Sequence, residues 1–298
     1  MTSPTLIFLH ILKTGGTTLN IILESYFSYE RSFSTFPTRQ HPKGSLAGFR
    51  ALTDEQKAQL DLLNGHMGFG LHGELPQTAV YITILRDPIE RVISRYYHIY
   101  RDPHSPYHQE MQLGQMSLKQ FVQFFAEEHN MDNLQTRMIA GNWNERGFGP
   151  CTEEMLATAK QNLRSYFAVV GLTERFDESY LLLKRHFGWP IAYYTHHNVA
   201  DNRPPVDDET RLFIEHYNQY DIALYKFVEE QFVAQIRQQG LGFQLELRLF
   251  QLRNWWHFFY LGKKRKYAPR LRHTYFRIRY FSVRVFVRKL FNQHKQSP

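Results

Sequence analysis

The chain has 298 residues, of which 43% are hydrophobic and 15% aromatic, so it can bury a large core and is not a disordered protein. Cys151 is the single cysteine, which excludes a disulfide-rich module and a zinc site built on cysteine ligands. The net charge of +8 is unevenly placed, because residues 245–298 contain fourteen Lys and Arg against one acid and carry +13, which leaves −5 for the rest.

The first predicted unit is a strand, a polar turn and a helix. Leu6 to Ile11 is a short apolar run typical of a buried strand, and Lys13 to Thr18 forms the turn. Apolar residues then recur at helical spacing, at Leu19, Ile22, Leu23, Tyr26 and Phe27.

The start of the sequence also bears on location. The first strand begins at about residue 6 and runs straight into the polar turn, so we expect no signal peptide. No stretch approaches the run of about 18–20 apolar residues that a membrane-spanning helix needs. We therefore expect a cytoplasmic protein, either free or held at a membrane surface.

Two later units follow the same order of strand, turn and helix. Ala79 to Leu85 predicts a strand, and Asp87-Pro88 with Glu90 is a helix start signal, with an N-cap acid followed by proline in the first turn. Phe167 to Leu172 predicts another strand, and a helix follows around Tyr180 to Phe187. Further helices are predicted over about 117–129, 152–166 and 207–238.

Repeated units of this kind predict the fold class. We expect a three-layer, P-loop-like α/β fold with a central parallel sheet flanked by helices, and such sheets bind ligands at the carboxyl ends of their strands. The composition changes near Gly240 to Gly242, where the basic and aromatic part begins. We expect one domain over 1–240 and a C-terminal extension over 241–298.

The turn after the first strand has the composition of an anion-binding loop. Gly15 and Gly16 allow backbone N–H groups to turn toward one point, and the following helix offers its unpaired first amides. Lys13 and the threonine hydroxyls add donors. The lysine precedes the glycines, so the segment does not match the G-x-x-x-x-G-K-[ST] loop of nucleoside triphosphatases. A simple Gly-Gly connection without a ligand is the alternative.

The turn after the second strand carries a further set of donors. Arg86 stands at the carboxyl end of the predicted strand, and Arg91, Ser94 and Arg95 share one helix face away from the apolar stripe. An arginine and a hydroxyl placed there can bind a second phosphate. Taken alone, the same residues also fit a solvent-exposed helix surface.

The two turns together resemble the loops of a known enzyme family. Lys13-Thr14-Gly15-Gly16-Thr17-Thr18, paired with Arg86-Asp87-Pro88 and Ser94, is similar to the sulfotransferases that use 3′-phosphoadenosine 5′-phosphosulfate (PAPS). More narrowly, the chain looks like the carbohydrate sulfotransferases that include the heparan sulfate 2-O and 6-O enzymes and their bacterial relatives, over roughly residues 5–205. Leu12 departs from the pattern, because relatives commonly have proline there.

The resemblance implies roles for these residues and an activity. Lys13, Thr14, Gly15, Gly16, Thr17 and Thr18 would hold the 5′-phosphosulfate, and Arg86 and Ser94 the 3′-phosphate. The enzyme would transfer a sulfuryl group in line to a hydroxyl of a saccharide or glycolipid, with Lys13 also stabilising the leaving phosphate.

A base must take the proton of the acceptor hydroxyl. The segment Asn64 to Gly70 is similar to the family's Gly-His segment, so we expect His66 to be the catalytic base, ahead of His72 and His10. We expect no metal, because the chain contains no H-E-x-x-H motif and no cluster of cysteines.

Several other polar residues have open roles. Asn133, Gln135, Thr173, Glu174 and Arg203 could contact cofactor or acceptor, or could be local helix caps and turn residues.

The tail mixes aromatic and basic residues, including Trp255, Trp256 and the cluster Lys263 to Lys266. This composition favours contact with an anionic membrane surface, with an acidic polysaccharide, nucleic acid or simple packing as alternatives. For the whole protein, a nucleotide-dependent kinase or NTPase and a non-catalytic polyanion-binding protein are the alternative functions.

Overall fold

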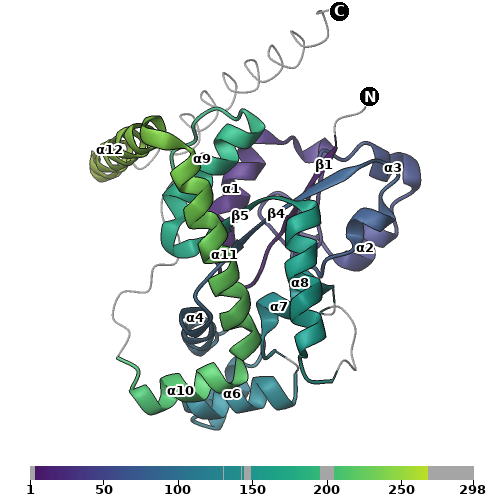
Figure 1. Cartoon of the computed structure of the whole chain (residues 1–298), viewed down its shortest axis with the longest axis vertical. Helices are drawn as coiled ribbons and strands as arrows, with labels where there is room; N and C mark the ends of the chain where they lie inside the picture. The colour runs from purple at the N-terminus through teal and green to yellow at the C-terminus, as the bar shows by residue number, and fades with distance from the viewer. Residues whose placement is uncertain (1–3, 130, 142, 144–148, 195–204, 268–298) are drawn as a thin grey trace, which may run out of the picture.

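A five-stranded parallel sheet forms the centre of the molecule (Figure 1). It is seen in a computed structural model that describes residues 4–129, 131–141, 143, 149–194 and 205–267. The strand order is β2-β3-β1-β4-β5. The strands are β1 (Thr5–Leu9), β2 (Ser32–Ser34), β3 (Leu62–Gly65), β4 (Ala79–Leu85) and β5 (Phe167–Leu172). The three predicted strands are confirmed; β2 and β3 are too short to give a clear apolar pattern.

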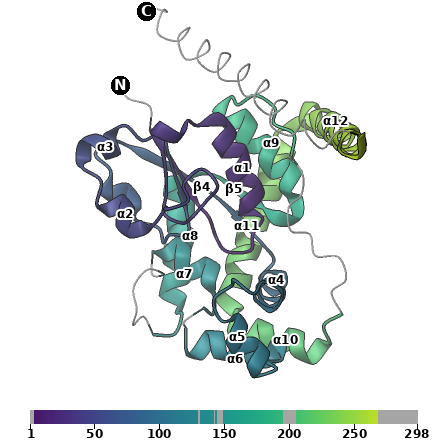
Figure 2. The same ribbon diagram turned by 180° about the vertical axis from the view of Figure 1, so that it is seen from behind.

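Helices cover both faces of the sheet, so the predicted three-layer α/β class is confirmed. The α-helices are α1 (Gly16–Tyr26), α2 (Leu46–Arg50), α3 (Asp54–Ala58), α4 (Pro88–Arg101), α5 (His108–Leu113), α6 (Leu118–Glu127), α7 (Leu134–Ala140), α8 (Glu153–Tyr166), α9 (Phe176–Phe187), α10 (Asp208–Tyr217), α11 (Gln219–Gln238) and α12 (Gly240–Tyr267). Helices α8 and α11 lie over the face turned to the viewer in Figure 1. On the opposite face α1 lies beside α9 (Figure 2), where the hydroxyls of Tyr26 and Tyr180 are 3.0 Å apart.

The register of the strands brings their carboxyl ends to one edge. Phe8 of β1 lies opposite both Asn64 of β3 and Ile82 of β4, so β4 runs two residues further than β1. Central strand residues are apolar and fully buried, as the near-continuous hydrophobic runs predict for a sheet covered on both faces. The turns after β1, β3, β4 and β5 therefore meet at this edge.

A second group of helices lies beyond the carboxyl edge. Helices α4, α5, α6 and α10 pack around their own apolar cluster, which includes Ile99, Met111, Phe121 and Ile214 (Figure 1). The predicted N-cap of α4 is confirmed, because the side chain of Asp87 accepts a hydrogen bond from the amide of Glu90. The cap fixes where α4 begins relative to the end of β4.

The helix predicted over 207–238 is two helices, α10 and α11. The break falls at Asn218, whose φ of −127° and ψ of 27° are not helical. Its side chain donates to the carbonyl of Ile214 and accepts from the amide of Asn133. Asparagine competes for backbone groups in this way, and here the competition ends α10.

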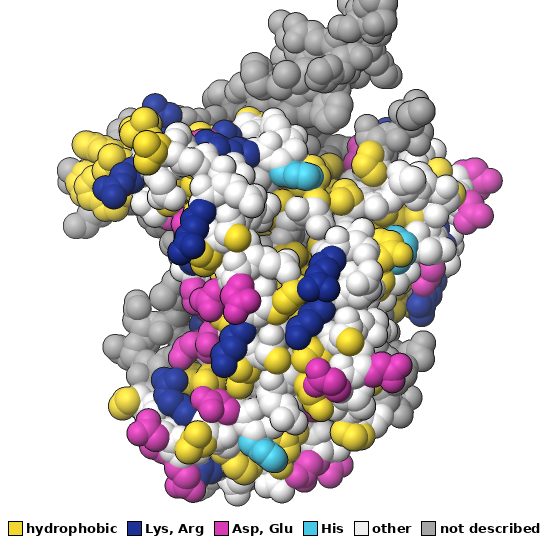
Figure 3. All heavy atoms as spheres, in the orientation of Figure 1, with side chains coloured by type: hydrophobic (Ala, Val, Ile, Leu, Met, Phe, Trp, Pro, Cys, Tyr) yellow, Lys and Arg dark blue, Asp and Glu magenta, His cyan; other side chains and the backbone are white. Residues whose placement is uncertain are grey.

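The tail begins with α12, whose first turns pack on the body. Phe243 and Phe250 are buried, and Glu246 forms ion pairs with Lys184 and Arg185 of α9. The other side of α12 exposes large apolar side chains (Figure 3), namely Leu241, Leu245, Leu249, Leu252, Trp255, Trp256 and Phe259. No helix in the described part of the chain is both long and apolar enough to cross a membrane.

Candidate functional site

Thr173 joins three of the turns at the carboxyl edge. Its hydroxyl lies 2.7 Å from the carbonyl oxygen of Thr14 and 3.0 Å from that of Leu85. The ends of β1, β4 and β5 are thereby held together. Thr173 is therefore placed as a structural contact of the loop.

The loop between β1 and α1 is shaped by two left-handed residues. Lys13 has a φ of 70° and Gly15 a φ of 80°, and the Thr14 hydroxyl donates to the carbonyl of Ile11. Gly15 is the N-cap of α1 and supplies no side chain to the first amides of the helix. These amides, with the positive end of the helix dipole, remain oriented toward the edge of the sheet. Thr17 is exposed there and Thr18 is buried.

Gly16 leaves room for an imidazole ring. A Cβ atom at Gly16 would lie 1.9 Å from Cδ2 and 2.0 Å from Nε2 of His10. No side chain fits at such distances, so the ring of His10 occupies space that only glycine provides. His10 also stacks on Phe8, with ring centroids 5.3 Å apart. The loop, the helix start and this ring thus form one packed unit.

A chain of buried amides orients His10. Asn64 donates to the side-chain oxygen of Asn20 at 3.0 Å, and Asn20 Nδ2 lies 3.4 Å from Nδ1 of His10. With Nδ1 accepting, the proton of His10 belongs on Nε2, next to Gly16. Burial, followed by the charges of His66 and Lys13, keeps the pKa of His10 well below its usual value. His10 is therefore neutral near pH 7.

His66 follows β3 and is held by His10. Its Nδ1 donates to the backbone carbonyl of His10 at 2.7 Å, which fixes the proton on Nδ1 and leaves the Nε2 lone pair available. The ring packs between His10 and Phe36, each with a centroid separation of 4.4 Å. Burial lowers the pKa of His66, the hydrogen bond to the carbonyl of His10 opposes this, and the charge of Arg95 adds to it, so that the pKa is about 4. This is the state that a general base needs.

His72 lies in a different environment. Its Nδ1 is 3.1 Å from the hydroxyl of Tyr81, and its ring packs on Phe69 and Tyr166. Tyr81 stands in the first half of β4, away from the carboxyl end. These contacts place His72 in an aromatic cluster of the body.

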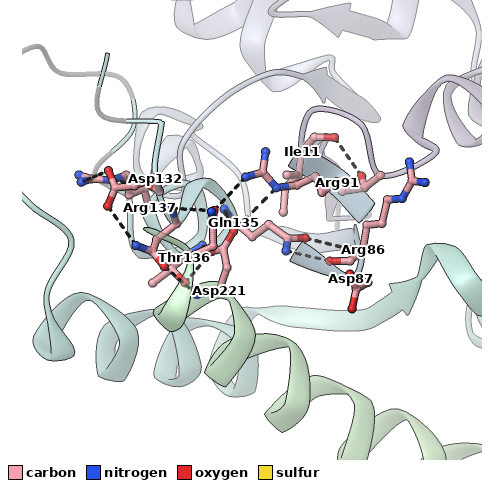
Figure 4. A network of polar contacts seen from close by, with 12 residues as sticks. Ile11, Arg86, Asp87, Arg91, Asp132, Gln135, Thr136, Arg137 and Asp221 are labelled. Carbon is pink, nitrogen blue, oxygen red and sulfur yellow. Dashed lines mark hydrogen bonds and ion pairs between the residues drawn. The ribbon is translucent and has the colours of Figure 1, made fainter. Parts of the chain in front are cut away.

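Arg86 is fixed at the carboxyl end of β4. Its amide donates to Gln135 Oε1 at 3.0 Å, and its carbonyl accepts from Gln135 Nε2 at 2.9 Å. Its guanidinium donates to the carbonyl of Lys13 at 3.2 Å, so the two turns are in direct contact. Figure 4 shows Gln135 lying along the backbone of Arg86.

Asp221 of α11 anchors the neighbouring helices. Its carboxylate accepts from the amides of Gln135 and Thr136 and from the Thr136 hydroxyl, at 3.1, 2.7 and 2.9 Å (Figure 4). Arg91 Nε lies 3.8 Å from the same carboxylate, and its side chain is 3% exposed. The interpretation of Arg91 as a surface charge is therefore wrong, because α10 and α11 cover this face of α4. Ser94 lies on the same face of α4, about one turn after Arg91, and it is also buried.

The remaining polar residues with open roles are structural where they are described. Asn133 Oδ1 accepts from the amides of Tyr220 and Asp221, and thus caps the start of α11. Glu174 accepts from the amide of Asp87 and the hydroxyl of Tyr225. Arg203 lies outside the described residues.

Positive charges meet at this edge. The pKa of His98 is lowered by burial and then by Lys13 and Arg95, and the pKa of Arg95 is lowered to about 10 by burial and then by Arg91. Arg86 likewise contributes to the lowered pKa of Arg91, after burial. We call the set Lys13, Arg86, Arg91 and Arg95 the cationic cluster, and the neutral imidazoles of His66 and His98 lie beside it. Groups that repel one another in this way are suited to bind an anion of several charges.

Part of this arrangement has no signal in the sequence analysis. His98 and Asn20 join the site although no motif includes them, and Asn64 belongs to the Gly-His segment, which predicts no role for it. His98 follows Arg91 by seven residues, so the helical spacing alone could have placed it on the same face. The two asparagines are found only when the strand ends and α1 are brought together.

A hollow of about 330 Å³ lies elsewhere, between α8, β5 and α11, and is lined by residues that include Phe167, Val228 and Phe232. It has none of the cationic cluster in its walls, so we do not assign the site to it. Among the described residues, no group of three or more His, Cys, Asp and Glu side chains is arranged to hold a metal ion.

The fold and the site define a class of protein. A parallel α/β sheet with an uncapped helix start, convergent cations and a neutral histidine at its carboxyl edge is the arrangement of an enzyme that transfers an anionic group. A sequence profile described as galactose-3-O-sulfotransferase matches residues 2–254, so the chain belongs to the galactose-3-O-sulfotransferase family of carbohydrate sulfotransferases.

Two relatives in sequence bear names of this class. Heparan-sulfate 6-O-sulfotransferase 1 of Cricetulus griseus is 28% identical over 276 residues, which cover 76% of this chain and 67% of the relative. Heparan-sulfate 6-O-sulfotransferase 3 of Mus musculus is 27% identical, with 76% of this chain and 57% of the relative covered. A sulfotransferase structure from Alicyclobacillus acidocaldarius matches 77% of this chain and 97% of its own, with 15% identity and a TM-score of 0.39. The family favours a sulfotransferase over a kinase or a non-catalytic binding protein.

The expected cytoplasmic location is wrong. The relatives are animal proteins named for heparan sulfate, and they do not support a cytoplasmic enzyme. The expectation rested on where the sequence begins. The chain spans only 57% of one relative's length, so that starting point carries no information about location.

We predict that Gly16→Ala disturbs the site while a glycine in open space does not. The added methyl group must displace the ring of His10, so we expect the free energy of unfolding to fall by about 1–3 kcal/mol. Gly73→Ala is the matched control, because a Cβ there meets no atom within 4 Å. Urea unfolding measures both variants. Equal stability of the two would show that the contact between Gly16 and His10 is not tight.

Proposed function

We propose that the chain transfers a sulfuryl group from PAPS to a hydroxyl of a saccharide or glycolipid. The observation that carries the proposal is the cationic cluster around the uncapped start of α1, next to a neutral histidine with a defined tautomer. PAPS carries a phosphosulfate on the 5′ position of its ribose and a phosphate on the 3′ position. It matches a site with donors on two adjacent turns.

The first turn would hold the 5′-phosphosulfate. The first amides of α1 and the side chains of Lys13, Thr17 and Thr18 would supply donors, while Gly15 and Gly16 let the ligand approach the backbone. Thr14 donates within the loop, so its role would be to shape the cradle. Gly16 supports the fit of an anion to this loop, because its Cα carries only a hydrogen atom toward the ring of His10.

The second turn would hold the 3′-phosphate. Arg86 is anchored through its backbone and already touches the Lys13 turn, so it bridges the two phosphate positions. Ser94 lies buried on the next turn of α4. A guanidinium and a hydroxyl are the usual partners of a terminal phosphate.

The proposed reaction is a single displacement at sulfur. The acceptor oxygen forms a bond to sulfur as the bond to the bridging phosphate oxygen breaks, and 3′-phosphoadenosine 5′-phosphate leaves. His66 Nε2 takes the acceptor proton, since Nδ1–H is committed to the carbonyl of His10. Lys13 and the loop amides stabilise the charge on the leaving phosphate, so the proposed step requires no metal.

The acceptor is proposed as a saccharide because of the family and the relatives' names.

The division of the chain at residue 240 and the contact of the C-terminal tail with an anionic membrane surface stay predictions. Exposed Trp255 and Trp256 beside Arg253 support such a contact. The side chains of Lys263 to Lys266 lie outside the described residues.

We predict that His66→Gln abolishes transfer without loss of donor binding. Glutamine keeps polarity but cannot act as a base near neutral pH, so kcat should fall by about 10²- to 10⁴-fold. The Kd of 3′-phosphoadenosine 5′-phosphate, measured by calorimetry, should change little. His72→Gln is the control and should keep the wild-type rate of product formation. Retention of more than about a tenth of the rate by His66→Gln would exclude His66 as the base.

We predict that the enzyme keeps its activity down to an unusually low pH. The neutral form of His66 is active and its pKa is lowered to about 4, so kcat/KM should stay near its plateau down to pH 5.5. A base with the ordinary pKa of about 6.5 would be about nine-tenths protonated at that pH. The pH profile of kcat/KM reports the free enzyme and so measures this value. An apparent pKa near 6.5 would contradict the assigned environment of His66.

A further inference from the structure

Phe36 lies beside the proposed base at the carboxyl edge of the sheet. Strands β2 and β3 are parallel with Ser34 opposite Asn64, so two residues further along each strand Phe36 stands next to His66. The two rings meet at an angle of 63°, and their centroids are 4.4 Å apart. Phe36 therefore contacts His66 from the side of β2, as His10 does from the side of β1.

The backbone at Phe36 is held in place on several sides. Ser34 Oγ donates to the carbonyl of Phe36 at 2.6 Å, and Thr35 Oγ1 donates to the carbonyl of His66 at 3.3 Å. Gly44 packs directly on this backbone, because a Cβ atom there would lie 2.6 Å from the carbonyl oxygen of Phe36. A ring on such a fixed support loses little conformational freedom when a ligand covers it.

The ring of Phe36 is nevertheless open to solvent. Its exposed fraction is 47%, and among the described residues the other exposed phenylalanine, Phe259, lies on α12. An acceptor hydroxyl must come within hydrogen-bond reach of His66, so the acceptor binds next to this ring. Phenylalanine offers no hydrogen bond, and what it can bind there is an apolar surface.

We propose that Phe36 binds the acceptor sugar by stacking on an apolar face of its pyranose ring. This inference rests on the proposed function and adds to it the residue that positions the acceptor. A pyranose has C–H groups on its faces and hydroxyls around its rim, so a sugar stacked on Phe36 can direct a rim hydroxyl toward His66 Nε2. The contact requires no charge on the sugar.

Phe36→Leu and Phe36→Tyr test the stacking in steady-state kinetics. The acceptor is a galactose-ended or a heparan-type oligosaccharide, whichever the wild-type enzyme sulfates faster. Leucine keeps an apolar side chain without a flat face, so kcat/KM for the acceptor should fall about 3- to 10-fold, mainly through KM. Tyrosine keeps the ring, so Phe36→Tyr should restore most of the wild-type value. An unchanged KM in Phe36→Leu would overturn the inference.

Saturation-transfer NMR observes the contact without turnover. Irradiation of the aromatic protons of the wild-type protein should saturate the C–H protons on the sugar ring of the same acceptor. These signals should be lost in Phe36→Leu and kept in Phe36→Tyr. Signals that are equal in the wild type and Phe36→Leu, or absent from both, would contradict the stacking.

Tyr29→Leu is the matched control. Tyr29 precedes β2 whereas Phe36 follows it, and its ring is 56% exposed and stacks on His41 with the centroids 4.8 Å apart. The variant thus removes an exposed ring from a histidine at the other end of the same strand. It should leave kcat and KM for the acceptor unchanged.

The pH profile of kcat/KM separates stacking from an effect on the base. If Phe36 served only to bury His66, Phe36→Leu would raise the apparent pKa of His66 toward its ordinary value, because burial is what lowers it. We expect the same profile as for the wild type. A raised pKa with a fall in kcat and no change in KM would show a purely structural role and overturn the inference.

The adenine of the donor is the other flat group that an aromatic ring can stack on. If calorimetry shows that Phe36→Leu weakens 3′-phosphoadenosine 5′-phosphate as much as it raises KM for the acceptor, Phe36 binds the donor and the inference is wrong. Absence of any transfer from PAPS to a saccharide by the wild-type enzyme would instead refute the proposed function, so the two failures are distinguishable.

Discussion

Mutual repulsion of positive charges at the carboxyl edge of the sheet is the constraint on which the rest of the structure depends. Lys13, Arg86, Arg91 and Arg95 come from two turns and one helix, and a fold must hold them together against this repulsion. Asp221 does so for Arg91, and Gln135 fixes the backbone of Arg86 from both sides. These supports come from α7 and α11, so helices far along the chain position a site built near its start.

The histidine side of the site depends on a second set of buried contacts. Asn64, Asn20 and His10 form a chain that ends at the ring beside Gly16, and the carbonyl of His10 determines which nitrogen of His66 carries the proton. A buried polar chain of this kind specifies one arrangement because each alternative leaves a polar atom unpaired. The loop that would bind the donor and the histidine that would act as base are therefore parts of one unit.

Much of the fold follows from local pattern. The apolar runs of β1, β4 and β5 and the cap at Asp87 are visible in the sequence, since each depends on neighbouring residues. The break at Asn218 is not, because it depends on hydrogen bonds to Asn133 across the molecule. Likewise the sequence pattern fits an exposed Arg91, and its burial follows only from the packing of α11, which places Asp221 next to it. Motif residues could thus be placed at the site from the sequence, whereas the residues that hold them could not. The location could not be inferred either, because the start of a sequence shorter than its relatives says nothing about it.

Calorimetric titration with 3′-phosphoadenosine 5′-phosphate and with ATP tests the central claim most directly. The two ligands share the adenosine and differ in where their charges lie, so only the first presents a 3′-phosphate to the second turn. The account predicts that the 3′,5′-bisphosphate binds more tightly by at least about tenfold, or about 1.4 kcal/mol. Tight binding of ATP with no response to the bisphosphate would contradict it.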